Sequence, residues 1–306
     1  MRQSTIFEIS SLYRDNFRVS GYTFGNGEKA VCVLGSIRGN EIQQIYTCSL
    51  LVERLKELEE NGAIHAGKKI LVIPSGNPYS MNISKRFWPT DNTDINRMFP
   101  GYHLGETTQR IAAGIFETVK DYQNGIQLAS FYMPGNFMPH VRMMKTGFED
   151  VERAREFGLP YIVLRTPRPY DTTTLNYNWQ IWETHAYSLY TTTTERIDPK
   201  SAAQAVRAML NFMAQEGILD YRSHKGYCSE VVDDRDMRSV RTSKAGIFEC
   251  CVEVGDEVKQ GDILACVRNP YDGSMREKIQ APQAGTIFFA HDAPLVYEST
   301  AVFKMV

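Results

Sequence analysis

The sequence predicts an α/β domain with a mostly parallel mixed sheet, followed by a smaller all-β domain. From about residue 29 to residue 217, short apolar runs alternate with helical patterns, as in folds whose parallel strands are joined by helices. After about residue 222, glycines and turn pairs recur every ten residues or so, and the helical periodicity ends. A length of 306 residues also favours two domains, at about 150 residues per domain. We therefore predict an α/β domain over residues 1–222 and a β domain over residues 223–306, with the boundary between Leu219 and Tyr227.

The strands of the first domain are predicted from short runs of apolar and β-branched residues. Such runs suit a sheet that is covered on both faces. They comprise residues 30–34, 70–74, 126–132, 161–164 and 187–194.

The helices between these strands are predicted from apolar residues that recur about every 3.6 positions. They comprise residues 41–61, 107–122 and 199–217, together with a more charged segment at 148–157. Pro199 at the start of the last helix and Gly217 at its end are typical of helix termini.

The second domain is predicted from its turns. Residues 254–264 read as strand, turn, strand and turn, and segment 244–248 resembles segment 283–288. Two similar β units packed together indicate a small β-sandwich or barrel.

Composition excludes several classes of function. The 34 Lys and Arg against 36 Asp and Glu, a net charge of -2, argue against a nucleic-acid partner, which would require a basic stripe. No uncharged apolar run approaches the ~18 residues of a membrane span. The first residues lack the apolar core of a signal peptide, and the six cysteines form no C-x-x-C pair, so we expect a cytoplasmic protein with reduced thiols.

Candidate binding residues follow two of the predicted strands. In open α/β sheets, ligands bind beyond the carboxyl ends of the strands. The first strand leads into a loop that contains Arg38 and Glu41, and the second leads into about 30 residues without periodicity, which is typical of a functional loop. That long loop holds Arg86 and then Asn96 and Arg97, whose donor groups suit a carboxylate. The alternative for any single arginine is solvation or a weak surface ion pair.

These loops carry the motifs of a known family. The first loop reads Gly-x-x-Arg38-Gly39-Asn40-Glu41, and the second holds Asn77-Pro78, Arg86 and Asp94-x-Asn96-Arg97-x-Phe99-Pro100-Gly101. With these motifs the chain resembles the succinylglutamate desuccinylase/aspartoacylase family, which are zinc-dependent amidohydrolases on the zinc carboxypeptidase fold. The resemblance covers roughly residues 30–305, because the C-terminal part is similar to the family's appended β domain, which itself resembles biotinyl/lipoyl barrels. It implies a deacylase of N-acyl amino acids or similar small carboxylates.

The resemblance also implies a zinc site, which this chain matches only in part. In the family, a His and a Glu of the first loop and a His after a later strand hold zinc, and zinc lowers the pKa of its bound water to about 7. Glu41 aligns with the Glu, whereas Arg38 and Ala129 stand where the two histidines are expected. A guanidinium ~4 Å from a divalent ion costs on the order of 8 kcal/mol at an effective dielectric of about 20. We therefore expect zinc to be absent or weakly bound, unless a relocated ligand such as His140 or His185 restores the site.

The remaining family roles fall on four residues. Arg86 aligns with the arginine that polarises the scissile carbonyl, and Asn96 with Arg97 aligns with the pair that holds the substrate's carboxylate. Glu195 aligns with the general base near the end of a late strand, although the glycine that usually follows it is missing.

Two functional classes remain open on the sequence. The first is a deacylase that uses Glu195 as base, Arg86 on the carbonyl, and Asn96 with Arg97 on the carboxylate. The second is a catalytically inactive descendant that binds a small anionic ligand through Arg38, Arg86 and Arg97, with Arg38 taking the place of the metal beside Glu41 and Glu195. The expected partner in both is a small anion similar to an acyl amino acid, and the β domain offers a surface for a homo-oligomer.

Overall fold

The computed structural model describes residues 1–13, 15–222 and 226–306. The chain divides into two compact units: Met1–Ser130 with Pro139–Val231, and Phe131–Met138 with Val232–Val306. The predicted boundary between residues 222 and 223 falls on residues outside the described part, and it stays a prediction. The division shows a feature that the sequence did not suggest, because an eight-residue segment within the first unit's sequence belongs to the second unit.

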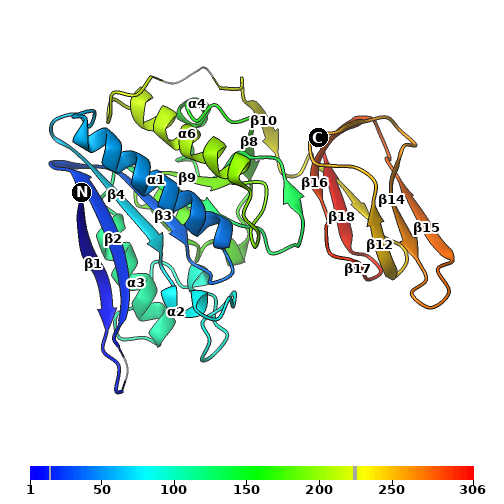
Figure 1. The fold of residues 1–306 in the computed structure, drawn as a ribbon, viewed down its shortest axis with the longest axis horizontal. Helices are drawn as coiled ribbons and strands as arrows, with labels where there is room; N and C mark the ends of the chain where they lie inside the picture. Colours follow the sequence, from blue (N-terminus) through cyan, green and yellow to red (C-terminus); the bar gives the residue numbers. More distant parts are fainter. Residues whose placement is uncertain (14, 223–225) are drawn as a thin grey trace. The chain divides into compact units, whose positions relative to one another are not determined.

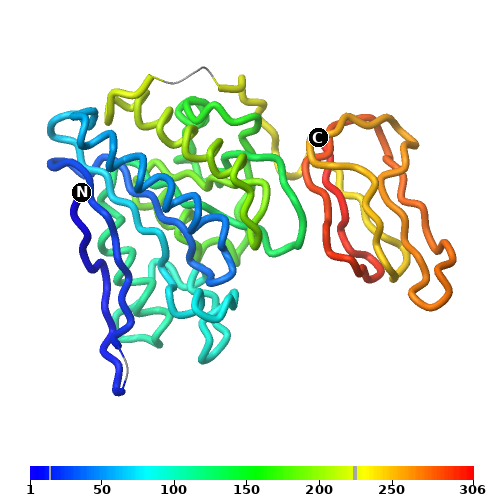
Figure 2. Tube along the Cα trace, in the orientation of Figure 1, coloured from blue at the N-terminus to red at the C-terminus, as the bar shows by residue number. Residues whose placement is uncertain are grey.

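Within the described residues, the first unit is built on a nine-stranded mixed sheet, in the order β1-β2-β4-β3-β5-β9-β7-β8-β10. The strands are β1 (Arg2–Ile9), β2 (Phe17–Gly25), β3 (Glu28–Ser36), β4 (Lys68–Ser75), β5 (Asn124–Ala129), β7 (His140–Met144), β8 (Tyr161–Arg165), β9 (His185–Tyr190) and β10 (Glu230–Asp233). The central pairs β4–β3, β3–β5 and β5–β9 are parallel, as is β7–β8, whereas β7 runs antiparallel to β9. The hairpin of β1 and β2 joins β4 at one side of the sheet, where Figure 2 shows it in blue.

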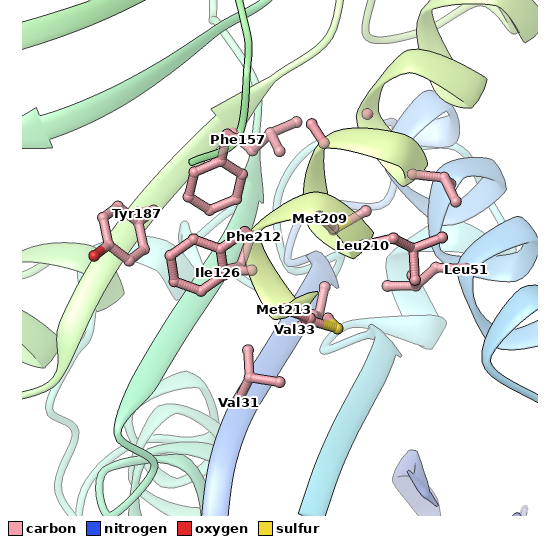
Figure 3. Close-up of a cluster of buried hydrophobic side chains, with 14 of the residues drawn as sticks. Val31, Val33, Leu51, Ile126, Phe157, Tyr187, Met209, Leu210, Phe212 and Met213 are labelled. Carbon is pink, nitrogen blue, oxygen red and sulfur yellow. The ribbon is translucent and has the colours of Figure 1, made fainter. Parts of the chain in front are cut away.

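The alternation of side chains along the strands divides the helices between the two faces of this sheet. Val31 and Val33 of β3 face the core beneath α1 (Ile42–Glu60) and α6 (Pro199–Gln215), which lie next to each other in Figure 1. Phe212 of α6 packs there against Tyr187, with ring centroids 5.1 Å apart, and Ile126 and Met209 belong to the same core, as Figure 3 shows.

The opposite face carries a second core. Cys32 and Leu34 of β3 point to it, beneath α3 (Thr107–Val119) and α5 (Leu175–Ile181). The short elements of this unit are α2 (Pro78–Met81), η1 (Ile95–Arg97), α4 (Val151–Arg155) and η2 (Pro169–Asp171). In the described part of the chain, no helix is both long and apolar enough to cross a membrane.

The structure corrects the predicted elements at several places. The late strand predicted over 187–194 is β9, which begins at His185 and ends at Tyr190, because Thr191 turns away with its hydroxyl bonded to the carbonyl of Thr193 at 3.0 Å. The strand predicted over 126–132 ends at Ala129. The charged helix predicted over 148–157 shrinks to α4, which Asp150 caps at its N-terminus.

The second unit contains strands in two antiparallel sheets. One has the order β11-β18-β16-β13, with β6 paired to β16, and the other has the order β15-β14-β12-β17. The strands are β6 (Asn136–Phe137), β11 (Arg238–Arg241), β12 (Gly246–Cys250), β13 (Glu257–Val258), β14 (Ile263–Arg268), β15 (Met275–Gln280), β16 (Gly285–Ala290), β17 (Leu295–Val296) and β18 (Ala301–Met305). Phe137 of the inserted β6 stacks on Phe289 of β16 with ring centroids 4.4 Å apart, so the insert is held to this unit by strand pairing and by an aromatic contact.

Candidate functional site

Arg38 is the centre of the candidate site, in the loop after β3. Its residue surface is 5% exposed, and all three side-chain nitrogens bind carboxylates. Nη1 donates to Glu41 at 3.1 Å, and Nη2 donates to Asp94 at 2.8 Å while Nε also faces that carboxylate. Burial alone would lower the pKa of Arg38, but Glu41 and Asp94 raise it above its ordinary value. Arg38 is therefore a permanent, buried cation.

Glu41 is bonded at both carboxylate oxygens. Oε2 accepts the backbone N–H groups of Ile37 and Arg38 at 2.9 and 3.0 Å. Oε1 accepts the Arg38 guanidinium and the hydroxyl of Ser130, the residue after β5. Four donors thus occupy a group that offers about four acceptor positions. The sequence predicted Glu41 as a zinc ligand, and the structure places it in a saturated hydrogen-bond network.

Asp94 connects Arg38 to the short helix η1. Its Oδ1 also accepts the backbone N–H of Asn96 at 3.0 Å, so it caps the element that carries Asn96 and Arg97. The Oδ1 of Asn96 accepts from Gln127 and from the backbone of Leu175, both at 3.4 Å. These contacts orient the amide of Asn96, and its Nδ2 is the group that can donate to a ligand.

Arg86 lies in the same electrostatic environment, half-buried in the loop after α2. Burial and the positive charge of Arg38 lower the pKa of Arg86, and Glu41, Asp94 and Glu195 oppose this effect. The structure thus brings together the residues that the two sequence motifs predicted. Gly39 permits the close approach, because a Cβ there would lie 2.2 Å from the carbonyl carbon of Ser80 at α2.

The ends of three strands form a row across the sheet beside Arg38. Ala129 of β5 is paired with Tyr190 of β9, which is paired in turn with His140 of β7. The rings of His140 and Tyr190 are stacked, with centroids 4.6 Å apart. His140 therefore stands two strands from Ala129, whereas His185 begins β9 and lies at its opposite end.

Tyr190 belongs to this row, whereas Glu195 lies outside it. The predicted base Glu195 is exposed, five residues beyond β9, and accepts a hydrogen bond from Asn40 at 2.6 Å. The strand itself ends at Tyr190, which is fully buried; burial raises its pKa, and the charges of Arg142, Arg165 and Arg38 oppose that rise.

Sequence reasoning missed several charged partners of the site. Asp94 was read only as part of a motif, and Asp171, Arg165 and Arg168 were not considered. Asp171 is buried and binds Arg97 at 3.4 Å and Arg165 at 3.1 Å. A local signal existed, because Arg165 and Arg168 directly follow a predicted strand, where ligand-binding loops are expected.

Among residues 1–13, 15–222 and 226–306, no three His, Cys, Asp or Glu side chains are grouped so that they could hold a metal ion. At the predicted zinc position the side chains that meet are a guanidinium and two carboxylates.

The family model of the succinylglutamate desuccinylase/aspartoacylase catalytic domain matches residues 27–215 of this chain. The N-α-acetyl-L-2,4-diaminobutyric acid deacetylase of Halomonas elongata is 22% identical over 269 residues, which are 79% of this chain and 71% of that protein.

Solved structures share the fold. A succinylglutamate desuccinylase from Silicibacter sp. TM1040 superimposes with a TM-score of 0.83 at 17% identity, over 99% of this chain and 94% of that one. The product-bound ectoine utilization protein EutE (DoeB) from Ruegeria pomeroyi has a TM-score of 0.78 at 20% identity, over 95% and 89% of the two chains. The fold with both of its units therefore recurs in these proteins.

Proposed function

Because the chain belongs to the succinylglutamate desuccinylase/aspartoacylase family, we propose that its first unit binds a small carboxylate of the N-acyl amino acid class without hydrolysing it through zinc. The family consists of deacylases, and the deacetylase of Halomonas elongata is a relative along most of the chain. The proposal therefore keeps the family's class of ligand but replaces zinc-dependent hydrolysis of that ligand by binding alone.

The observation that carries the proposal is the saturation of Glu41. A zinc ion would need this carboxylate, yet four donors already bind it, and one of them is the positively charged Arg38. The positions of the two family histidines hold an arginine and an alanine, which supply no neutral nitrogen ligand. The residues present do not fit zinc, and no step of the proposed function passes through it.

Ligand recognition is assigned to the part of the site outside the Arg38 network. Arg86 is positioned for a carbonyl or carboxylate oxygen of the ligand. Asn96, through Nδ2, and Arg97, through its guanidinium, hold a carboxylate, in keeping with their family roles. The side-chain nitrogens of Arg38 donate to Glu41 and Asp94. We therefore assign Arg38 a structural role, in which it links η1 to the first loop.

A second candidate is a zinc-dependent deacylase with a relocated ligand. It is favoured by the deacetylase relative and by His140, which lies in the same row across the sheet as Ala129. In this candidate Glu195 acts as the base.

Metal analysis, calorimetric titration and acetate release measured on one preparation separate the two candidates. We expect N-acetyl amino acids to bind, zinc to be substoichiometric after incubation with zinc salt and desalting, and no acetate to be released. One zinc per chain that is lost in Glu41→Ala but kept in Glu53→Ala, with acetate released, would establish the deacylase. Glu53 is the matched control because it is exposed on α1, the helix that begins after Glu41. Failure of all N-acetyl amino acids to bind or react would overturn both candidates.

A further inference from the structure

The centre of the candidate site has no excess of positive charge. Arg38 and Arg86 contribute two positive charges, and Glu41 with Asp94 contributes two negative charges in their immediate environment. Glu195 adds a third negative charge beside Arg86. Such a centre does not attract an anion by its net charge, so the charge that selects an anionic ligand has to come from neighbouring residues.

A group of three arginines, Arg97, Arg165 and Arg168, surrounds Asp171 at the end of η2. The side chain of Asp171 is 6% exposed and accepts from the guanidiniums of Arg97 and Arg165. Arg168 donates its backbone N–H to the same carboxylate at 3.1 Å. The hydroxyl of Tyr170 then accepts from Arg165 at 3.3 Å and from Arg168 at 2.9 Å. Three positive charges therefore meet one negative charge, on a loop whose geometry is held by hydrogen bonds.

This group is continuous with the candidate site through Arg97. Arg97 follows Asn96 on η1, the element that Asp94 caps, and its guanidinium lies over the ring of Tyr170 at 5.3 Å. The charge of Arg165 acts on Tyr190 together with that of Arg38. Arg165 ends β8, whose carboxyl end is level with the amino ends of β5 and β9, so Arg97 is the residue that links this group to the Arg38 network.

The guanidiniums also have donor groups available for a ligand. The side chain of Arg97 is 35% exposed, and Arg168 is exposed. In the described part of the chain, the side-chain hydrogen bonds of both residues use Nη1. A guanidinium has five N–H groups in a planar fork, which matches the two oxygens of a carboxylate.

We propose that Arg97, Arg165 and Arg168, gathered around Asp171, form the anion-binding subsite of this protein, which binds one carboxylate of its ligand. Arg165 and Arg168 are the specificity-determining residues that no family motif identifies here, and Asp171 is a positioning residue that holds the guanidiniums. The proposal rests on the proposed function, because it takes the ligand to be a small carboxylate.

The test is a calorimetric titration in which each arginine variant is measured with each of several ligands. The probes are N-acetyl-L-glutamate and its two monoamides, with the amide on the side chain in one and on the α-carboxyl group in the other. The variants are Arg168→Gln and Arg165→Gln, and the control is Arg207→Gln, an exposed arginine on α6 of the same unit. Arg168 is exposed, so the protein with Arg168→Gln folds even if Arg165→Gln does not.

We expect Arg168→Gln to weaken binding of N-acetyl-L-glutamate about five- to tenfold, because it removes a charge-assisted hydrogen bond at a partly exposed position. One of the two monoamides should lose this sensitivity, which identifies the carboxylate that the subsite holds. Arg207→Gln should bind all three probes as the wild type does.

Three outcomes would overturn parts of the account separately. If the wild type binds no probe, the proposed function fails together with the subsite. If the wild type binds but Arg168→Gln and Arg165→Gln behave as Arg207→Gln does, the subsite fails and the proposed function stands. Inorganic phosphate that binds the wild type more tightly than N-acetyl-L-glutamate, with the same loss in Arg168→Gln, would overturn the assignment of a carboxylate.

Discussion

The two ends of the central strands in the first unit both bury polar groups, but with different partners. At the carboxyl ends of β3 and β5, Arg38 lies between Glu41 and Asp94, and the buried charges are paired. At the amino ends of β5 and β9, Glu156 and Glu216 lie close enough for a hydrogen bond between their carboxyl groups. Buried atoms near that second cluster have no hydrogen-bond partner in the described part of the chain: Glu156 Oε2, Asn124 Oδ1 and the Tyr187 hydroxyl.

The difference shows two ways in which a fold accommodates buried carboxyl groups. At one end, the carboxylates of Glu41 and Asp94 are paired with the guanidinium of Arg38. At the other end Arg153 pairs with Glu216 at 3.5 Å, and among the described residues Glu156 forms no ion pair. Burial, followed by the charge of Glu216, raises the pKa of Glu156 to about 7. Arg153 opposes this rise and Asp150 adds to it, while His185 and Tyr187 face the same charges from β9.

The largest expected effect comes from breaking the paired end. Arg38→Met leaves two buried carboxylates without their cation, and we expect it to lower the free energy of unfolding by about 3–5 kcal/mol. Urea unfolding monitored by circular dichroism measures this change. Arg54→Met is the control, because Arg54 is an exposed arginine of α1 and its ion pair with Glu57 is worth less than about 1 kcal/mol. Equal losses in the two variants would mean that Arg38 contributes no more than a surface charge.

The free energy of unfolding should depend on pH through Glu156, at the other end of the strands. Because the pKa of Glu156 is raised from 4.5 to about 7 in the folded state, its stabilising effect is complete below pH 4.5 and is lost as the pH rises to about 7. After allowance for solvent screening, the loss amounts to roughly 1.5 kcal/mol. Glu156→Gln should remove this part of the pH dependence, measured as unfolding free energy from pH 4.5 to pH 8. Glu152→Gln, at a glutamate that is 84% exposed on α4, should keep it; identical profiles for all three proteins would contradict the shifted pKa.

The smallest expected effects on the free energy of unfolding come from removing one hydroxyl group at each end of the strands. Ser130→Ala removes a donor to Glu41 and should lower the free energy of unfolding by about 1 kcal/mol. Tyr187→Phe removes a hydroxyl for which the described residues supply no hydrogen-bond partner, and should change stability by less than about 0.5 kcal/mol. Chemical unfolding of both variants measures the contrast, and a larger loss for Tyr187→Phe than for Ser130→Ala would reverse it.

Local pattern was sufficient for strands that form continuously buried apolar runs and for helices with a regular apolar periodicity. The apolar runs at β3, β4 and β8 and the periodicity of α1 and α6 correspond closely to the observed elements. Pattern failed for α5, because Asn176, Asn178 and Gln180 are buried there and a polar run reads as a loop. It also missed the N-terminal hairpin, since the faces of β1 are only partly buried and its apolar signal is weak.

The sequence predicted one contact of the candidate site, that of Arg38 with Glu41. Glu195, the other partner predicted for Arg38, accepts a hydrogen bond from Asn40 instead. The two loop motifs identified Arg38, Glu41, Arg86, Asn96 and Arg97, because each motif is continuous in sequence. The ion pair of Arg38 with Asp94 joins residues 56 positions apart, and that of Arg97 with Asp171 joins residues 74 positions apart. No local pattern encodes such pairs, since they exist only after the strands have brought their loops to one edge.

Because β6 belongs to the second unit, the second unit is not encoded by one continuous stretch of sequence. The chain passes between the units after Ser130, after Met138 and after Val231, so the units are joined by three covalent links. A single cut after Val231 would leave Phe131–Met138 attached to the first unit, with Phe137 deprived of Phe289 and β6 deprived of β16. Residues 232–306 are therefore not a module that recombination at one point can add or remove. Gain or loss of the second unit requires a coordinated change directly after Ser130, the residue whose hydroxyl binds Glu41.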